Sequence, residues 1–189
     1  MIQSLSTTSL SHERSAVVVL VEANKAALIQ LAEVIDRLSD DEYQQRSVNG
    51  VASSIGSHVR HCLDHVQALA DAVALGELDY DARQRGTAME TQPAIARRSI
   101  EALIARLQSI RDQPGQIELE LRTISHRDGP AIEGLPTCLG RELAFVLHHT
   151  IHHASLIAVI LAGLGHTVPV DLGYAPATPL PAMEASCAR

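Results

Sequence analysis

Apolar residues recur at three- and four-residue spacing along four long segments of the chain. That spacing is the period of an α-helix that buries one face. Proline lies in the first turn of one segment and glycine follows the end of two others, as is usual where helices begin and end. The pattern predicts helices over about residues 15–38, 53–75, 93–111 and 139–164.

A different pattern separates the third and fourth predicted helices. In "QIELELRTI", residues 116–124, apolar and polar residues alternate, and a period of two predicts a short, half-exposed strand. A segment rich in glycine and proline follows at residues 125–140 and is expected to be a loop. We therefore expect an all-α protein: a four-helix bundle with a long crossover that contains a short strand between helices three and four.

The length of the chain indicates one domain. Its 189 residues are enough to bury a hydrophobic core, so we expect a single domain over residues 1–189, with flexible ends at about 1–11 and 180–189. Hydrophobic residues make up 46% of the chain but aromatic residues only 2%. The core must then be aliphatic, and this composition favours helices over strands.

Charge and composition narrow the classes of function. The formal net charge of −7 disfavours a phosphate backbone as the main partner, and the scarcity of aromatic rings disfavours base stacking. The three cysteines form no CxxC motif, as is typical of a reducing compartment. The chain shows no signal-peptide pattern and no uncharged apolar run of about 18 residues. We expect a cytoplasmic protein that binds neither nucleic acid nor membranes.

Histidines cluster on two of the predicted helices, in "SIGSHVRHCLDHV" on the second and "HHTIHH" on the fourth. Within each segment they recur at three- and four-residue spacing, so their imidazoles project from shared helical stripes. They are His58, His61 and His65 on the second helix, and the pairs His149 with His153 and His148 with His152 on the fourth.

Two interpretations of this cluster are open. Imidazoles from two facing helices are a common way to hold a divalent metal such as Zn, Ni or Fe, and three of them leave a coordination position open. The alternative is a hydrogen-bonded network of histidines and carboxylates without an ion. Asp64 and Glu142 lie near the two stripes and are expected to orient the ligand imidazoles from behind.

Three arginines and one tyrosine are candidates for binding substrate. Arg60 adjoins His61, and Arg83 and Arg85 lie in the polar segment "DYDARQRGTAME". A guanidinium group there can hold an anionic substrate group, although a solvated loop is the alternative. Tyr174, in the proline-rich tail, is expected to reach the mouth of the site, or else to belong to a tail docked on the bundle. The sequence assigns no catalytic residue.

The two histidine segments resemble the DinB-like (DinB/YfiT) superfamily of four-helix-bundle proteins. The likeness is carried by "SIGSHVRHCLDHV" and by "ELAFVLHHTIHHASLIAVILAGLGHTVPVDLG". Members show a histidine on the second helix, and HxxHH before a long apolar stretch that closes with G, P and D. Here "ASL" follows the last histidine where many members have "RGQ", and the flanking histidines are additional. Both departures are consistent with a distinct branch of the family.

The resemblance implies a metal triad of His61, His149 and His153. The alternates are His58, His65, His148 and His152. It further implies a divalent metal, often zinc or nickel, a homodimer, and reactions of a low-molecular-weight thiol such as bacillithiol, mycothiol or glutathione. The expected function is therefore a metal-dependent thiol S-transferase that acts on a small electrophile. The alternatives are a metal-dependent hydrolase and a non-catalytic metal-binding or stress-response bundle.

Overall fold

The computed structural model describes residues 4–46 and 53–180, and side chains from residue 16 onward. Of the ends that we expected to be flexible, residues 1–3 and 181–189 lie outside this range. Residues 4–11 belong to the first helix.

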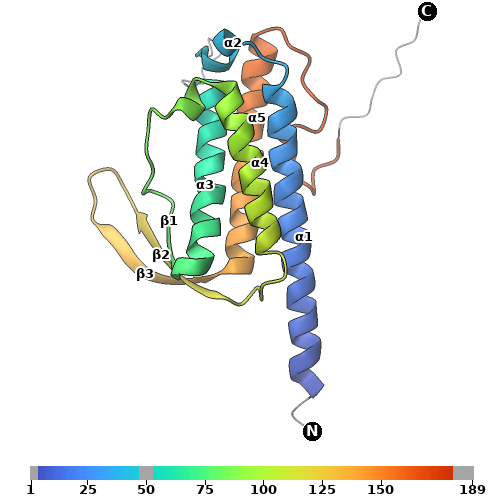
Figure 1. Cartoon of the computed structure of the whole chain (residues 1–189), viewed down its shortest axis with the longest axis vertical. Coiled ribbons are helices and arrows are strands. Elements are labelled where there is room, and N and C mark those ends of the chain that lie inside the picture. Colours follow the sequence, from blue (N-terminus) through green and yellow to red (C-terminus); the bar gives the residue numbers. More distant parts are fainter. Residues whose placement is uncertain (1–3, 47–52, 181–189) are drawn as a thin grey trace, which may run out of the picture.

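Four long helices lie side by side (Figure 1): α1 (Ser4–Ile35), α3 (Ile55–Leu75), α4 (Pro93–Ser109) and α5 (Leu139–Gly163). Helices α1 and α3 each pack against both α4 and α5. The predicted ends of the last three helices lie within two residues of the observed ones. Helix α1 begins well before the expected start at about residue 15. The prediction missed its first turns because they contain few apolar residues and therefore show no helical periodicity.

Local signals in the sequence account for several helix ends. The Ser54 side chain caps α3, and Gly76 ends that helix with a positive φ of 78°, which glycine adopts without a steric penalty. Pro93 occupies the first turn of α4. A short helix that we did not predict, α2 (Asp40–Gln44), is held by a capping box headed by Ser39.

The all-α prediction is corrected by a three-stranded sheet. It consists of β1 (Glu77–Asp79), β2 (Glu118–Ile124) and β3 (Ala131–Cys138), in the order β1-β2-β3. Strand β1 runs parallel to β2, and β3 runs antiparallel to it. Only β2 matches the predicted strand, since β3 lies in the segment that we expected to be a loop, and β1 directly follows the second predicted helix, where we predicted no strand.

Composition explains why β3 was missed. It contains Gly134 and Pro136, two residues that disfavour strands. Because β3 is an edge strand, however, it can hold a proline that donates no ladder hydrogen bond. The buried side chains of Leu78 and Leu119 anchor the sheet to the helices. A short 3₁₀ helix, η1 (Ala88–Glu90), connects the sheet to α4.

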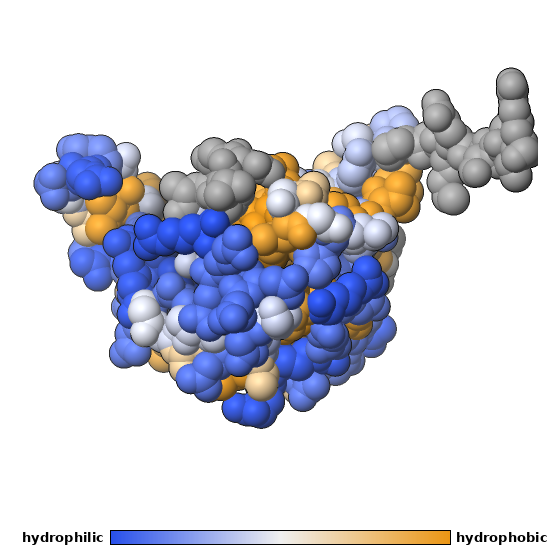
Figure 2. Space-filling model, turned by 90° about the horizontal axis from the view of Figure 1, so that it is seen from above, coloured by the Kyte–Doolittle hydropathy of each residue, from blue (hydrophilic) through white to orange (hydrophobic). Residues whose placement is uncertain are grey.

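The aliphatic core lies between the four long helices, while the face shown in Figure 2 is mostly hydrophilic. Among the described helices, α5 alone is long and apolar enough to cross a membrane by length and composition. It packs against α1 and α3 and buries much of its apolar side in this core. The burial of its apolar residues in the core therefore explains why α5 is so hydrophobic. The fully buried side chains of the core include Leu28, Leu31, Leu63, Leu69, Ile100, Leu107, Leu143, Ile157 and Ile160.

Candidate metal centre

Helices α3 and α5 bring the predicted triad together. One ring nitrogen from each of His61, His149 and His153 lies within 4.8 Å of the others, and the Nε2 atoms of His61 and His149 are 2.9 Å apart. His149 and His153 share a stripe of α5 because four residues make about one helical turn. The packing of α3 on α5 adds His61 from the opposite side.

Two of the alternate histidines lie behind this triad. The Nδ1 atom of His58 is 2.9 Å from the Nδ1 of His153, and its Nε2 is buried without a hydrogen-bond partner. His65 donates from Nδ1 to the carbonyl oxygen of His61 over 2.9 Å, and its ring stacks on that of His149 with centroids 4.2 Å apart. Both contacts restrict the orientation of a ring in the triad.

The other two alternates lie on the exposed side of α5. His148 and His152 are both exposed, and the ring of His152 is 5.2 Å from that of His153. Neither belongs to the converging set within the described part of the chain. The stripe through His149 and His153 therefore faces α3, whereas the second i, i+4 pair does not.

Burial keeps the three imidazoles uncharged. It lowers the pKa of His61 to about 2, that of His153 to about 3 and that of His149 to about 4. Each value is lowered further because a proton on one ring would be repelled by a proton on a neighbouring histidine and, at His61 and His149, by Arg83. A set of neutral imidazole lone pairs at this separation suits Zn, Ni or Fe(II). The residues present therefore fit a divalent metal.

The two carboxylates expected to orient the ligands have other partners. Asp64 accepts a hydrogen bond from Arg60 Nη1 over 2.6 Å. Glu142, which is fully buried, accepts one from the hydroxyl of Tyr80 and another from Thr137. Instead of bonding directly to the triad, Glu142 links α5 to the sheet. Tyr80 then connects it to the histidines, because its ring stacks on His65 with centroids 4.8 Å apart.

The candidate substrate-binding residues do not share one environment. Arg83 Nη1 contacts His61 Nδ1 directly, and burial followed by the charge of Arg60 lowers the pKa of Arg83. Arg60 is buried between carboxylates, and Arg85 is exposed. Tyr174 lines a separate cavity of about 380 Å³ between α1, α5 and the tail, so the structure does not bring it to the histidines.

Aromatic contacts extend the centre beyond the residues we predicted. Phe145 stacks on His149 with ring centroids 5.6 Å apart and lies 5.2 Å from the ring of Tyr80. The position of Phe145, four residues before His149, is the signal that would have identified it. Tyr80 lies in the polar segment of Arg83, where nothing in the pattern indicated contact with a histidine.

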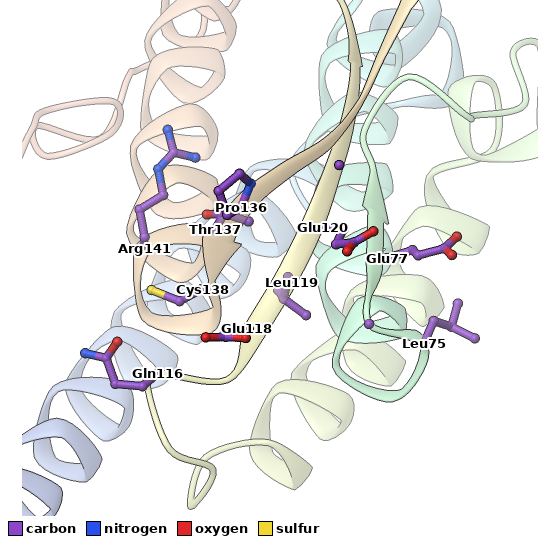
Figure 3. A pocket seen from close by; sticks show the side chains of 12 residues that line it. Leu75, Glu77, Gln116, Glu118, Leu119, Glu120, Pro136, Thr137, Cys138 and Arg141 are labelled. Carbon is purple, nitrogen blue, oxygen red and sulfur yellow. The ribbon is translucent and has the colours of Figure 1, made fainter.

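A wide cavity lies elsewhere, between the sheet and the beginning of α5 (Figure 3). Its volume is about 950 Å³, and no histidine lines it. Exposed carboxylates such as Glu77 and Glu118 surround it, together with Cys138 and Arg141. The histidine cluster therefore lies outside this cavity.

The sequence model of the DinB superfamily matches residues 24–157, which include all seven clustered histidines. The match covers well over half of the chain, and the protein belongs to the DinB superfamily. No curated protein matches it.

Proposed function

We propose that this protein is a divalent-metal-dependent thiol S-transferase that acts on a small electrophile. The supporting observation is the convergence of three neutral imidazoles, from His61, His149 and His153, out of two helices. Three such ligands leave a coordination position open, as in catalytic rather than structural zinc sites. The choice of thiol chemistry rests on the likeness to the family described above.

A divalent metal bound by these residues would supply a positive charge that lowers the pKa of an approaching thiol. The protein's own groups prepare the site. Burial keeps the ligand imidazoles unprotonated at neutral pH, while His58 and His65 hold two of the rings in place. Tyr80 and Phe145 cover one side of His65 and His149. In the transfer, the thiolate sulfur bonds to the electrophilic carbon, and the leaving group departs with its electron pair.

The same donor set suits activation of water, so hydrolysis is the alternative reaction. A non-catalytic metal-binding or stress-response bundle is the third possibility. In the leading proposal the four long helices form a four-helix bundle, and the metal is bound between α3 and α5. The protein works in the cytoplasm as a homodimer, on a small-molecule substrate.

Metal content is the first test. We expect untagged protein to contain close to one equivalent of metal by elemental analysis, and His61→Ala and His149→Ala to abolish it. His148→Ala is the matched control, because this histidine is exposed on the same helix. An absence of metal in the wild type, with no stabilisation by added zinc or nickel, would contradict the proposal and leave a histidine network without an ion.

The reaction is tested next, on the metal-loaded protein. Consumption of an alkyl halide electrophile that requires an added thiol supports transfer. Consumption of an ester that needs no thiol supports hydrolysis. Stoichiometric metal without either activity supports the non-catalytic bundle.

A further inference from the structure

The three arginines near the centre differ in their free hydrogen-bonding capacity. Arg60 is neutralised on both sides: its Nη1 is 2.6 Å from Asp64 Oδ2 and its Nε is 2.6 Å from Glu90 Oε1. Only 8% of Arg60 is exposed. Arg85 is exposed and makes none of the hydrogen bonds described for this loop. Arg60 and Arg85 therefore do not present a desolvated, unpaired charge to the histidines.

Arg83 does present such a charge. It lies half-buried in the loop between β1 and η1, with Nη1 against Nδ1 of His61. Among residues 16–46 and 53–180, whose side chains are described, no carboxylate forms an ion pair with it, although Asp64 and Asp81 act on its charge from a longer distance. The loop around it is held in shape from α3, since Arg60 Nη1 donates to the carbonyl oxygen of Gln84 over 3.3 Å. Glu90, the partner of Arg60, also accepts from the backbone N–H of Gly86 over 2.8 Å.

Binding of a metal changes what Arg83 can bond to. A guanidinium only donates hydrogen bonds, so Arg83 requires Nδ1 of His61 to be an acceptor. A neutral imidazole that uses Nε2 as a metal ligand carries its proton on Nδ1 and is a donor there. Occupation of the centre therefore leaves Arg83 without its acceptor. The surroundings are then strongly cationic, because the three ligands are neutral and contribute no compensating charge.

We propose that Arg83 is the residue that recognises the small-molecule ligand of this centre, by pairing with a carboxylate carried close to its thiol group. This inference rests on the metal-binding function proposed above. A guanidinium fork matches a carboxylate in two parallel hydrogen bonds. The guanidinium group of Arg83 balances one negative charge. Arg60 cannot balance a second negative charge, because its own charge is already neutralised by Asp64 and Glu90. A carboxylate therefore fits this site better than a phosphate dianion.

Binding of two simple thiols to the Co²⁺-loaded protein tests the proposal. Mercaptoacetate carries a carboxylate, and mercaptoethanol is its uncharged counterpart of similar size. We expect wild-type protein to bind mercaptoacetate about tenfold more tightly, as measured from the visible absorption of Co²⁺, and Arg83→Ala to remove that preference. Arg85→Ala, two residues further along the loop and exposed, is the matched control and should keep the preference. Arg83→Ala should bind Co²⁺ at least as well as wild type, because it removes a nearby cation.

The outcomes separate the two proposals. An equal preference for mercaptoacetate in wild type and Arg83→Ala overturns the inference but leaves the metal centre intact. Loss of Co²⁺ binding in Arg83→Ala also overturns it, since Arg83 would then support the centre itself. Inorganic phosphate and acetate are compared as competitors of mercaptoethanol. If phosphate competes more strongly than acetate, and Arg83→Ala removes this competition, the assignment of a carboxylate is overturned. Wild-type protein that binds no Co²⁺ refutes the proposed function, and with it this inference.

Discussion

His58 and His153 face each other through their Nδ1 atoms, 2.9 Å apart, across the contact between α3 and α5. One of the two nitrogens must donate and the other accept. When His153 donates, its Nε2 keeps a lone pair for a metal. His58, an alternate ligand in the sequence interpretation, thus lies where it can set the tautomer of a ligand.

This pairing predicts the effect of His58→Phe. The ring volume is retained but the hydrogen bond is lost, so we expect the affinity for Zn²⁺ to fall by about 10- to 100-fold. A competition titration against a chelating dye measures the change. His152→Phe is the control, because His152 is exposed on α5 and outside the converging set. Equal affinities for the two variants would show that His58 does not orient His153.

The lowered pKa values predict an acid-sensitive metal-free protein. The pKa of His149 falls from 6.5 to about 4 on folding because the ring is buried beside His65. Between these values the unfolded chain binds a proton that the folded chain does not, so stability is highest above pH 6.5 and decreases as the pH falls towards 4. Urea unfolding from pH 7.5 to 4.5 measures the decrease.

His149→Gln should make that decrease shallower, by up to about 1.4 kcal/mol per pH unit for one proton. His148→Gln, which removes an exposed histidine one residue away, should leave the slope close to that of wild type. A wild-type stability that does not change over this interval would contradict the buried, neutral state of the cluster.

Arg60 is expected to be a large contributor to stability. Arg60→Met leaves the carboxylates of Asp64 and Glu90 without their cation, and breaking a buried ion pair costs roughly 3 kcal/mol. Thermal and urea unfolding measure the loss. Arg97→Met is the matched control: its pairs with Asp36 and Glu101 are exposed and should be worth about 1 kcal/mol or less.

The same variant reports on the loop that carries Arg83. Without Arg60, the hydrogen bond to the carbonyl oxygen of Gln84 is lost, so trypsin should cleave after Arg83 or Arg85 faster than in wild type. Cleavage at an unchanged rate, with the stability lowered as predicted, would show that Arg60 supports α3 but not this loop.

Gly56→Ala is expected to destabilise the fold near the centre. A Cβ atom at this position would lie 2.7 Å from Cε1 of Tyr43 and would also clash with the carbonyl group of Glu90. Such overpacking costs about 1–3 kcal/mol. At Gly140, in the first turn of α5, the nearest atom is 3.3 Å away, so Gly140→Ala should cost less. If chemical unfolding gave equal losses for both, close packing of α3 against η1 would not explain the glycine.

Periodicity was sufficient to predict the long helices but not the sheet. Over α3, α4 and α5 the apolar spacing, the Ser54 cap, Gly76 and Pro93 all indicate the same ends. Strand β1 has three residues, too few for any period. Strand β3 carries Pro136 and is tolerated only because it lies at an edge of the sheet, a fact about its neighbours that the residues themselves do not contain.

The same limit applies to the surroundings of the histidines. Spacing on each helix identified which imidazoles share a stripe, and the structure brings together His61, His149 and His153. Besides Arg141 in α5 itself, the partners of Glu142 come from the sheet and its flank: Tyr80 directly follows β1 and Thr137 lies in β3. Since neither strand was predicted, the only guide to the role of Glu142 was its position on the same helix as His149. That position predicted a contact with a ligand imidazole, and the described hydrogen bonds of Glu142 do not include one.

The separation of His61 and His149 along the chain has a consequence for biogenesis. These residues face each other across 88 positions, and the second belongs to α5, which follows the other three long helices in the chain. The three imidazoles can therefore converge only after α5 has docked on α3, so a metal ion held by them would bind late in folding. A bound ion would then act as a clip that closes a long loop, and it would slow unfolding of the finished protein without guiding the early steps of its folding.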